Sequence, residues 1–174
     1  KMSYAEELEY LVTNEKRNEF LLNLLRHLRG NTLCLFQLVE KHGKILNDKM
    51  KGSENVYFVY GGTDTSDREK IRGLVETHTK STTIASFGVF STGINIRNIN
   101  NIVLASPSKS KIRVLQSIGR GLRRSDIKDS ILIYDIADDI SYNERRNFTL
   151  NHFTERLNIY NEEQFDYDIS KVKL

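Results

Sequence analysis

Short apolar runs alternate along the chain with longer segments in which apolar residues recur at helical spacing. The runs are rich in β-branched and aromatic residues, and they predict strands at residues 32–36, 55–60, 82–86, 101–106 and 130–137. The intervening segments predict helices at residues 15–29, 38–50, 112–122 and 143–160, and one more that carries Ile71, Leu74 and Val75. Strands that alternate with helices require crossover connections. We therefore expect an α/β fold with a mainly parallel central sheet and helices on both faces.

Local signals mark where several of these elements begin and end. Gly30 follows the first helix and predicts its stop, and Gly61 and Gly62 end the second strand. Ser66 and Glu69 have the S-x-x-E spacing of a capping box, which predicts a helix start at Ser66. The chain of 174 residues has no internal repeat or low-complexity tract, and its length suits one domain with a full core.

Composition narrows the class of protein without identifying it. The net charge of +3 is weakly basic, so it permits a nucleic-acid partner but does not argue for one. The single cysteine, Cys34, cannot form an internal disulfide and lies in an apolar run, which predicts a buried thiol in a reducing compartment. No stretch is apolar enough to span a membrane and no signal-peptide pattern opens the chain, so we expect a cytoplasmic protein.

The loops after the predicted strands carry the first candidate binding residues, because ligands of open parallel sheets bind outside the carboxyl ends of the strands. Gln37 follows the first strand, and Gly61 and Gly62 follow the second. The third loop, SFGVFSTGINI at residues 86–96, is the richest in glycine and hydroxyl groups. Its amides and hydroxyls suit a phosphate cradle, but an ordinary turn between a strand and a helix also requires glycine. The loop alone leaves both interpretations open.

A second candidate is the segment LQSIGRGLRR at residues 115–124. Its helix has one apolar face, and three arginines gather at the far end: Arg120, Arg123 and Arg124. Cations at the C-terminal end of a helix are often only a solvated surface that opposes the helix dipole. Planar guanidinium groups are also suited to bind phosphate oxygens. Taken alone, the segment favours the solvated surface.

The order and spacing of these segments resemble the second RecA-like domain of superfamily-two helicases and translocases. Residues 81–106 resemble motif V of that family, QSIGRGLRR resembles motif VI, and the first strand with Gln37 lies where motif IV belongs. Within the superfamily, the stretch from motif V to motif VI is most similar to the branched-DNA helicases of T-even phages. The resemblance implies a three-layer RecA-like domain at residues 31–140, after a linker and leading helix from a first RecA-like domain at residues 1–30. A C-terminal helix and tail follow at residues 141–174.

The resemblance implies a role for each matching residue. Arg120 and Arg123 are the candidate catalytic residues, because the motif VI arginines of the family contact the γ-phosphate of ATP. The residues implied in ATP binding are Gly93, Asn95, Gln116 and Gly119. The residues implied in contact with the nucleic-acid backbone are Gln37, Gly61, Gly62, Ser86, Phe87, Ser91 and Thr92. Many relatives have histidine in place of Gln116 and aspartate in place of Asn95. An asparagine at position 95 favours a motor on duplex or branched DNA.

The chain contains neither a G-x-x-x-x-G-K-[ST] loop nor a DEAD or DExH box. The family needs both, on its first domain, to bind ATP with Mg²⁺. The resemblance therefore implies that the chain, which begins at Lys1, is a fragment that holds half of a motor and cannot hydrolyse ATP alone. The expected partners are branched or duplex DNA and the first domain of the same polypeptide, in recombination, repair or replication. Two alternatives stay open: a stand-alone RecA-like adaptor that binds nucleic acid, and another motor of the superfamily, such as a restriction translocase or an RNA helicase.

Other conspicuous residues have ordinary structural interpretations. The acidic run ADD at residues 137–139 follows the last strand and predicts a polar turn rather than a metal pair. The four histidines are scattered without ligand spacing, so we expect no metal site. Tyr57 and Tyr60 alternate with apolar residues on a strand, which favours packing over base stacking. The basic run KSKIR at residues 109–113 either contacts a phosphate backbone or forms a solvated first turn of its helix.

Overall fold

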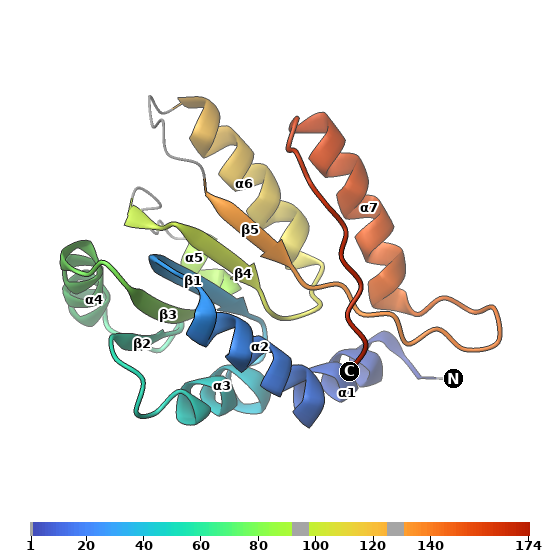
Figure 1. Cartoon of the computed structure of the whole chain (residues 1–174), viewed down its shortest axis with the longest axis horizontal. Helices are drawn as coiled ribbons and strands as arrows, with labels where there is room; N and C mark the ends of the chain where they lie inside the picture. Colours follow the sequence, from blue (N-terminus) through green and yellow to red (C-terminus); the bar gives the residue numbers. More distant parts are fainter. Residues whose placement is uncertain (1, 92–97, 125–130) are drawn as a thin grey trace.

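Five parallel strands form the centre of the protein, in the order β2-β3-β1-β4-β5 (Figure 1). The computed structural model describes residues 2–91, 98–124 and 131–174, and for Ser91 and residues 119–124 it describes the backbone alone. The strands are β1 (Asn31–Phe36), β2 (Val56–Val59), β3 (Ser81–Ser86), β4 (Asn101–Leu104) and β5 (Leu132–Asp135). The prediction of an α/β fold with a parallel sheet is confirmed.

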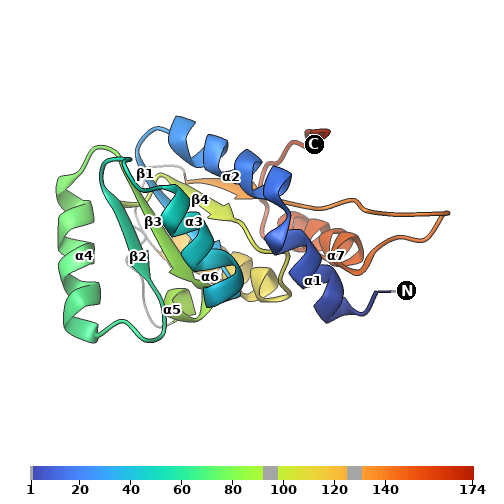
Figure 2. The same cartoon turned by 90° about the horizontal axis from the view of Figure 1, so that it is seen from below.

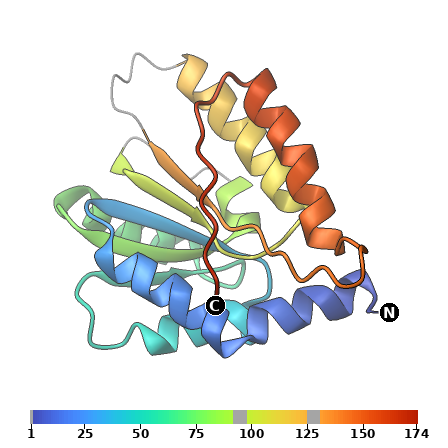
Figure 3. The same cartoon turned by 45° about the vertical axis from the view of Figure 1, so that its right-hand side comes forward.

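Helices cover both faces of this sheet (Figures 1 and 2). They are α1 (Tyr4–Thr13), α2 (Glu15–His27), the π-helical turn η1 (Val39–Gly43), α3 (Lys44–Lys49), α4 (Thr65–Thr77), α5 (Phe87–Ser91), α6 (Ser110–Arg124) and α7 (Phe148–Glu162). One face packs against α2 and α3, through residues such as Leu21 and Leu46. The other packs against α4 to α7, through residues such as Val75, Ile118 and Ile159. Figure 3 shows α6 and α7 lying side by side.

The two cores meet at the central strand β1. Leu33 and Leu35 belong to the core beneath α4 to α7, whereas Cys34 and Phe36 belong to the core beneath α2 and α3. Successive side chains of a strand face opposite sides, so a strand covered on both faces appears in the sequence as one apolar run. Cys34 is fully buried, as predicted, and burial raises the pKa of its thiol to about 12.

The direction of the strands separates the two ends of the domain. All carboxyl ends lie at one edge of the sheet, here called the carboxyl edge, where the chain continues through Gln37, Tyr60, Phe87, Ala105 and Ile136. Helix α6 begins beside this edge and runs back along the sheet, so its C-terminal end lies toward the opposite, amino edge (Figure 1). The candidate nucleic-acid residues and the motif VI arginines therefore belong to different ends of the domain.

Two helix starts differ from the sequence predictions. Helix α4 begins at Thr65 with Asp64 as its N-cap, so the predicted capping box at Ser66 and Glu69 is wrong. The Thr63 N–H donates to the Tyr60 carbonyl at 3.0 Å and closes a turn that ends immediately before Asp64. Helix α7 begins at Phe148 rather than near residue 143, because Asn143 and Glu144 have left-handed backbone angles that an α-helix does not accept.

The N-terminal segment is more regular than the sequence predicted. Helix α1 was not predicted, and it starts with a complete capping box between Ser3 and Glu6. Helix α2 ends at His27 with Leu28 as its extended C-cap. Gly30 follows two residues later with a left-handed φ of +82°, which favours glycine. No helix within the described ranges combines the length and the apolar character needed to cross a membrane.

Candidate functional site

Gln37 is the centre of a polar cluster at the carboxyl edge. Its backbone N–H donates to Ser106 Oγ at 2.9 Å, which ties the end of β1 to the loop after β4. Its side-chain Oε1 accepts from Ser108 Oγ at 3.0 Å and from Ser110 Oγ at 3.4 Å. Among the described residues the side-chain nitrogen has no partner, and the side chain is exposed. The cluster therefore fixes an amide donor that faces solvent beside the start of α6.

A buried histidine, His42, supports the Gln37 cluster through a hydrogen bond to Ser106. His42 Nδ1 lies 2.8 Å from Ser106 Oγ, the same hydroxyl that accepts from Gln37. His42 is fully buried. Burial, with a smaller contribution from the nearby Arg17 guanidinium, lowers the pKa of His42 to about 3, so the ring is neutral at pH 7. Sequence reasoning missed this supporting role, and no signal in the sequence marks it.

The glycine turn after β2 is the second part of the carboxyl edge. A Cβ at Gly62 would lie 2.6 Å from the Tyr60 ring, so a larger residue there would displace that ring, whereas a Cβ at Gly61 would meet nothing within 4 Å. Arg68 of α4 donates to the carbonyls of Tyr60 and Gly61, at 3.3 and 3.0 Å. The turn is exposed, and its backbone is bound by an arginine that the sequence analysis did not identify.

The remaining motif V residues divide into three groups. Ser86 is half-buried at the end of β3 and lies at the carboxyl edge. Phe87 is only 5% exposed and packs in the core, so its side chain is not available to nucleic acid and only its backbone could make such a contact. Ser91 ends α5 and is described by its backbone alone. The predicted positions Thr92, Gly93 and Asn95 lie outside the described residues.

The residues predicted to form motif VI all lie on α6. Gln116 is half-buried in the middle of the helix. Gly119, Arg120 and Arg123 lie in its last turns, where the backbone is helical and the side chains are outside the described part. The helical spacing brings residues 120, 123 and 124 to one end of α6, as the sequence predicted, and this end points toward the amino edge of the sheet (Figure 1).

Comparison with known proteins identifies the family. A model of the helicase conserved C-terminal domain matches residues 16–125. The chain belongs to this family. The ATP-dependent DNA helicase uvsW of Enterobacteria phage T4 is 35% identical over 186 residues, which cover 99% of the chain and 37% of that helicase. A putative ATP-dependent helicase of Saccharomyces cerevisiae, IRC3, is 28% identical over 133 residues, which cover 74% of the chain and 19% of that protein.

Solved structures agree with the family. The crystal structure of T4 UvsW matches with a TM-score of 0.77 at 35% identity, over 93% of the chain and 35% of the UvsW chain. The C-terminal part of the Fun30 ATPase domain matches with a TM-score of 0.58 at 14% identity, over 93% of the chain and 58% of that structure, which shows the shared fold alone. The RecA-like fold is thereby confirmed. The chain spans little more than a third of the T4 helicase and a smaller share of the yeast protein.

A buried ionic cluster connects the motif VI helix of this helicase domain to α7. Asp135, at the end of β5, accepts from Lys111 of α6 at 3.1 Å and from Arg156 of α7 at 2.6 Å, and it also accepts from the Tyr160 hydroxyl. Lys111 donates in addition to the Ile136 carbonyl at 2.6 Å. Burial lowers the pKa of Lys111 to about 8, although Asp135 opposes the shift. Lys111 is fully buried, so at this position the predicted phosphate contact or solvated turn of KSKIR is wrong.

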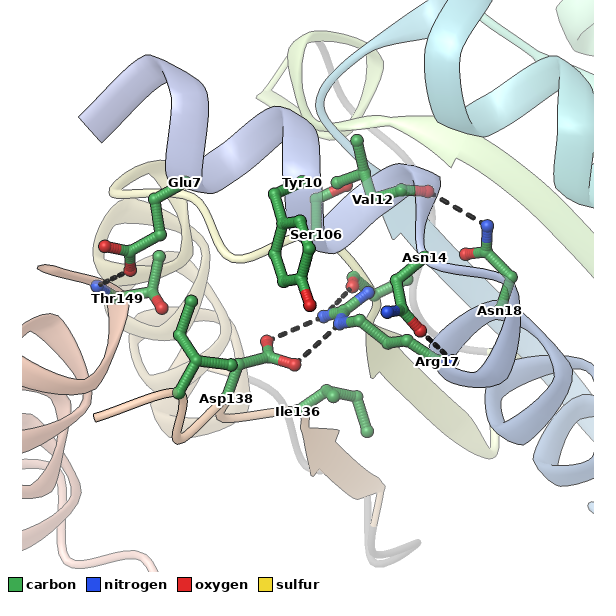
Figure 4. A network of polar contacts seen from close by, with 12 residues as sticks. Glu7, Tyr10, Val12, Asn14, Arg17, Asn18, Ser106, Ile136, Asp138 and Thr149 are labelled. Atoms are coloured by element: carbon green, nitrogen blue, oxygen red, sulfur yellow. Dashed lines mark hydrogen bonds and ion pairs between the residues drawn. The ribbon is translucent and has the colours of Figure 1, made fainter. Parts of the chain in front are cut away.

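A second polar network joins the N-terminal helices to the segment after β5 (Figure 4). Arg17 of α2 pairs with Asp138 through two hydrogen bonds of 2.7 and 2.9 Å and donates to the Ala105 carbonyl at 2.7 Å. Glu7 of α1 accepts from the backbone N–H groups of Phe148 and Thr149, at 3.0 and 2.8 Å. A carboxylate of α1 thus caps α7. The polar turn predicted at residues 137–139 is not found, because the chain continues from β5 through these residues without a turn and Asp138 is held by its pair with Arg17.

The buried His42 predicts an acid-sensitive stability. The histidine pKa is about 6.5 in the unfolded chain and about 3 in the folded chain. The unfolded state therefore binds the proton more tightly, and the contribution of neutral His42 to stability is complete above pH 6.5 and decreases as the pH falls toward 3. We expect the free energy of unfolding to fall by about 2 kcal/mol from this residue between pH 6.5 and 5, at about 1.4 kcal/mol per unit.

Urea unfolding at pH 7, 6 and 5 measures this effect. The variant His42→Gln should lose most of the pH dependence in this range, and the matched variant His27→Gln, at an exposed histidine, should keep it. If the free energy of unfolding depends on pH equally in the wild type and in His42→Gln, His42 is not the source of the pH dependence.

Proposed function

We propose that this domain is the C-terminal half of an ATP-dependent DNA motor. It completes the ATP site with Arg120 and Arg123 and contacts the nucleic-acid backbone through the carboxyl edge. The separation of the two ends of the domain carries the proposal, because α6 presents the motif VI arginines at one end and the Gln37 cluster lies at the other. A motor requires this separation, since nucleotide binding must change nucleic-acid contacts at a distance.

Each end has a defined chemical task in this proposal. At the carboxyl edge, the free amide of Gln37, the open Gly61 turn and the hydroxyl of Ser86 offer hydrogen bonds to phosphate oxygens, which position nucleic acid without reading its sequence. At the other end, Arg120 and Arg123 stabilise charge on the transferred phosphoryl group of ATP. Gln116 and Gly119 on the same helix, with Gly93 and Asn95 of motif V, line the nucleotide. The ligands of Mg²⁺ are assigned to the first RecA-like domain, because the chain has no Walker A or DExH sequence.

The buried clusters supply the rigid body that such a motor needs. Asp135 fixes α6 to β5 and α7, and Arg17 with Glu7 fixes α1 and α2 to the segment after β5. In our proposal, closure of the two RecA-like domains around ATP moves this unit as a whole, and hydrolysis reopens the cleft. Branched or forked DNA is the preferred substrate in this proposal, on the strength of the similarity to a T4 DNA helicase and of Asn95 in motif V.

The test compares the full-length protein with this chain alone. ATPase activity is measured without DNA, with linear duplex and with forked DNA. The proposal predicts a silent chain, an active full-length protein and greater stimulation by forks than by linear duplex. A full-length protein that binds DNA but never hydrolyses ATP would overturn the motor in favour of an adaptor, and stimulation by RNA alone would indicate an RNA helicase.

A further inference from the structure

A tight turn between β5 and α7 carries an unusually exposed aromatic side chain. Tyr142 is 78% exposed, and the next most exposed large apolar residue of the described part is Val172 at 59%. The segment that holds Tyr142 projects from the body of the domain, as the orange trace between β5 and α7 shows (Figures 1 and 2). The ring of Tyr142 is therefore accessible to a partner outside the domain.

The turn has a defined backbone. Tyr142 and Arg145 form an antiparallel bridge, in which the N–H of each donates to the carbonyl of the other, at 3.2 and 3.1 Å. The two residues between them, Asn143 and Glu144, have φ of 48° and 61°. Two successive left-handed residues form the tightest kind of hairpin turn, and here neither is glycine. Such a conformation persists only when its surroundings hold it in place.

Asn147 supports the turn and is itself held by the buried carboxylate of Glu7. The Oδ1 of Asn147 accepts from the Ile140 N–H at 3.1 Å and from the Ser141 hydroxyl at 3.4 Å, so it closes the base of the turn. The Nδ2 of Asn147 donates to Glu7 Oε1 at 2.9 Å, and Glu7 is itself buried against α7. The base is therefore anchored in the network of Figure 4, while the tip stays in solvent.

The chemistry of the tip suits an unpaired nucleotide. An exposed tyrosine ring stacks on any base, because every base has a planar π-face. Arg145 and Arg146 follow directly and are both exposed, and although Arg146 donates to Thr154 Oγ1 at 3.1 Å, its other N–H groups stay available for phosphate oxygens. With Glu144 as the only acid, residues 141–146 carry two positive charges and one negative charge. The segment also leaves the same edge of the sheet as Gln37.

We propose that Tyr142 stacks on an unpaired base of the nucleic acid while Arg145 and Arg146 contact the flanking phosphates. The turn at residues 141–146 is then a second nucleic-acid contact of this domain, outside motifs IV to VI. This inference rests on the proposed function, in that nucleic acid is the partner. It adds a contact with a base, whereas the Gln37 cluster contacts the backbone.

The experiment uses the full-length protein and forked DNA with 2-aminopurine in the unpaired arms beside the junction. Stacking of tyrosine on 2-aminopurine quenches its fluorescence, so the quench reports the contact directly. The variants are Tyr142→Ala, Tyr142→Phe and, as a matched control at another exposed tyrosine, Tyr167→Ala. Tyr142→Ala should lose the quench and bind the fork about 5- to 150-fold more weakly, the range for one stacked base. Tyr142→Phe and Tyr167→Ala should resemble the wild type.

The salt dependence of binding tests the two arginines. Replacement of both by alanine should reduce the slope of log affinity against log salt by about 0.7 for each lost phosphate contact to a single strand. Retained quench and affinity in Tyr142→Ala would overturn the stacking proposal. An unchanged quench with a loss of thermal stability would place Tyr142 against another part of the protein and would also overturn it.

Measuring the ATPase of the wild type in parallel separates the two proposals. A quench that depends on Tyr142 in a protein without DNA-stimulated ATPase supports the stacking and rejects the motor. Normal DNA-stimulated ATPase together with an equal quench in the wild type and in Tyr142→Ala rejects the stacking alone. A protein that binds no nucleic acid rejects both.

Discussion

Replacing Arg123 by alanine in the full-length protein should lower DNA-stimulated ATPase by about three to five decades, the range known for arginine fingers. The reason is that the γ-phosphoryl group spreads negative charge over its oxygens as it is transferred, and a guanidinium inserted from the second domain stabilises that charge. The position of residue 123 in the last turn of α6, at the end away from the carboxyl edge, is the observation that motivates the variant.

The affinity for DNA should change little in Arg123→Ala, because the candidate nucleic-acid residues lie at the other end of the domain. Arg123→Lys keeps the charge but loses the planar fork, so it should recover only part of the rate. Arg124→Ala is the matched control, since Arg124 lies outside the G-R-x-x-R pattern of motif VI. Normal turnover in Arg123→Ala, or an equal loss in Arg124→Ala, would contradict the role assigned to Arg123.

Replacing Asp135 by asparagine should destabilise the domain by about 3–5 kcal/mol, the range for breaking a buried ion pair by removing one partner. Burial alone would raise the pKa of Asp135, but Lys111 and Arg156 lower it to about 2, so the side chain is charged at pH 7. Lys111 and Arg156 are buried even more deeply than Asp135, and in the variant both cations lose their carboxylate.

Urea unfolding at pH 7 measures the effect, with Asp48→Asn as the control. Asp48 pairs with Lys51 on the surface at 3.3 Å, and pairs of that kind contribute about 0–1 kcal/mol. Because Asp135 fixes α6 through Lys111, the ATPase of the full-length variant should also fall at temperatures where the domain is still folded. If Asp135→Asn lowers the free energy of unfolding by less than about 1 kcal/mol, then water or a rearrangement must provide hydrogen bonds to the two cations.

The order of elements could be predicted from the sequence because each one carries its own local pattern. The five apolar runs became five strands, and Gly30 lies in the connection between α2 and β1 with the left-handed conformation that favours glycine. Boundaries were less predictable, since they depend on contacts as well as on pattern. The predicted capping box at Ser66 is wrong because α4 begins at Thr65, with Asp64 as its N-cap, directly after the turn at Tyr60–Thr63.

The residues of the candidate site could be predicted where they follow a strand directly in the sequence. They could not be predicted where the orientation of a side chain depends on residues far away in the sequence. Gln37, Gly61 and Ser86 lie together at the carboxyl edge because parallel strands bring their ends to one side. Phe87 belonged to the same predicted set, but its side chain turns into the core. Nothing local distinguishes a phenylalanine that faces solvent from one that, like Phe87 at the start of α5, packs in the core.

The sequence by itself determined the family and the parallel α/β fold, because these depend on residue type and spacing along the chain. Only the tertiary structure decided which charges are buried. Lys111 lay in a basic run that resembles solvated surface, and Asp138 in an acidic run that resembles a turn. Each has its partner far away in the sequence, at Asp135 and Arg17. A charge becomes structural only when folding removes its water and supplies a partner, and that pairing is a property of the folded protein.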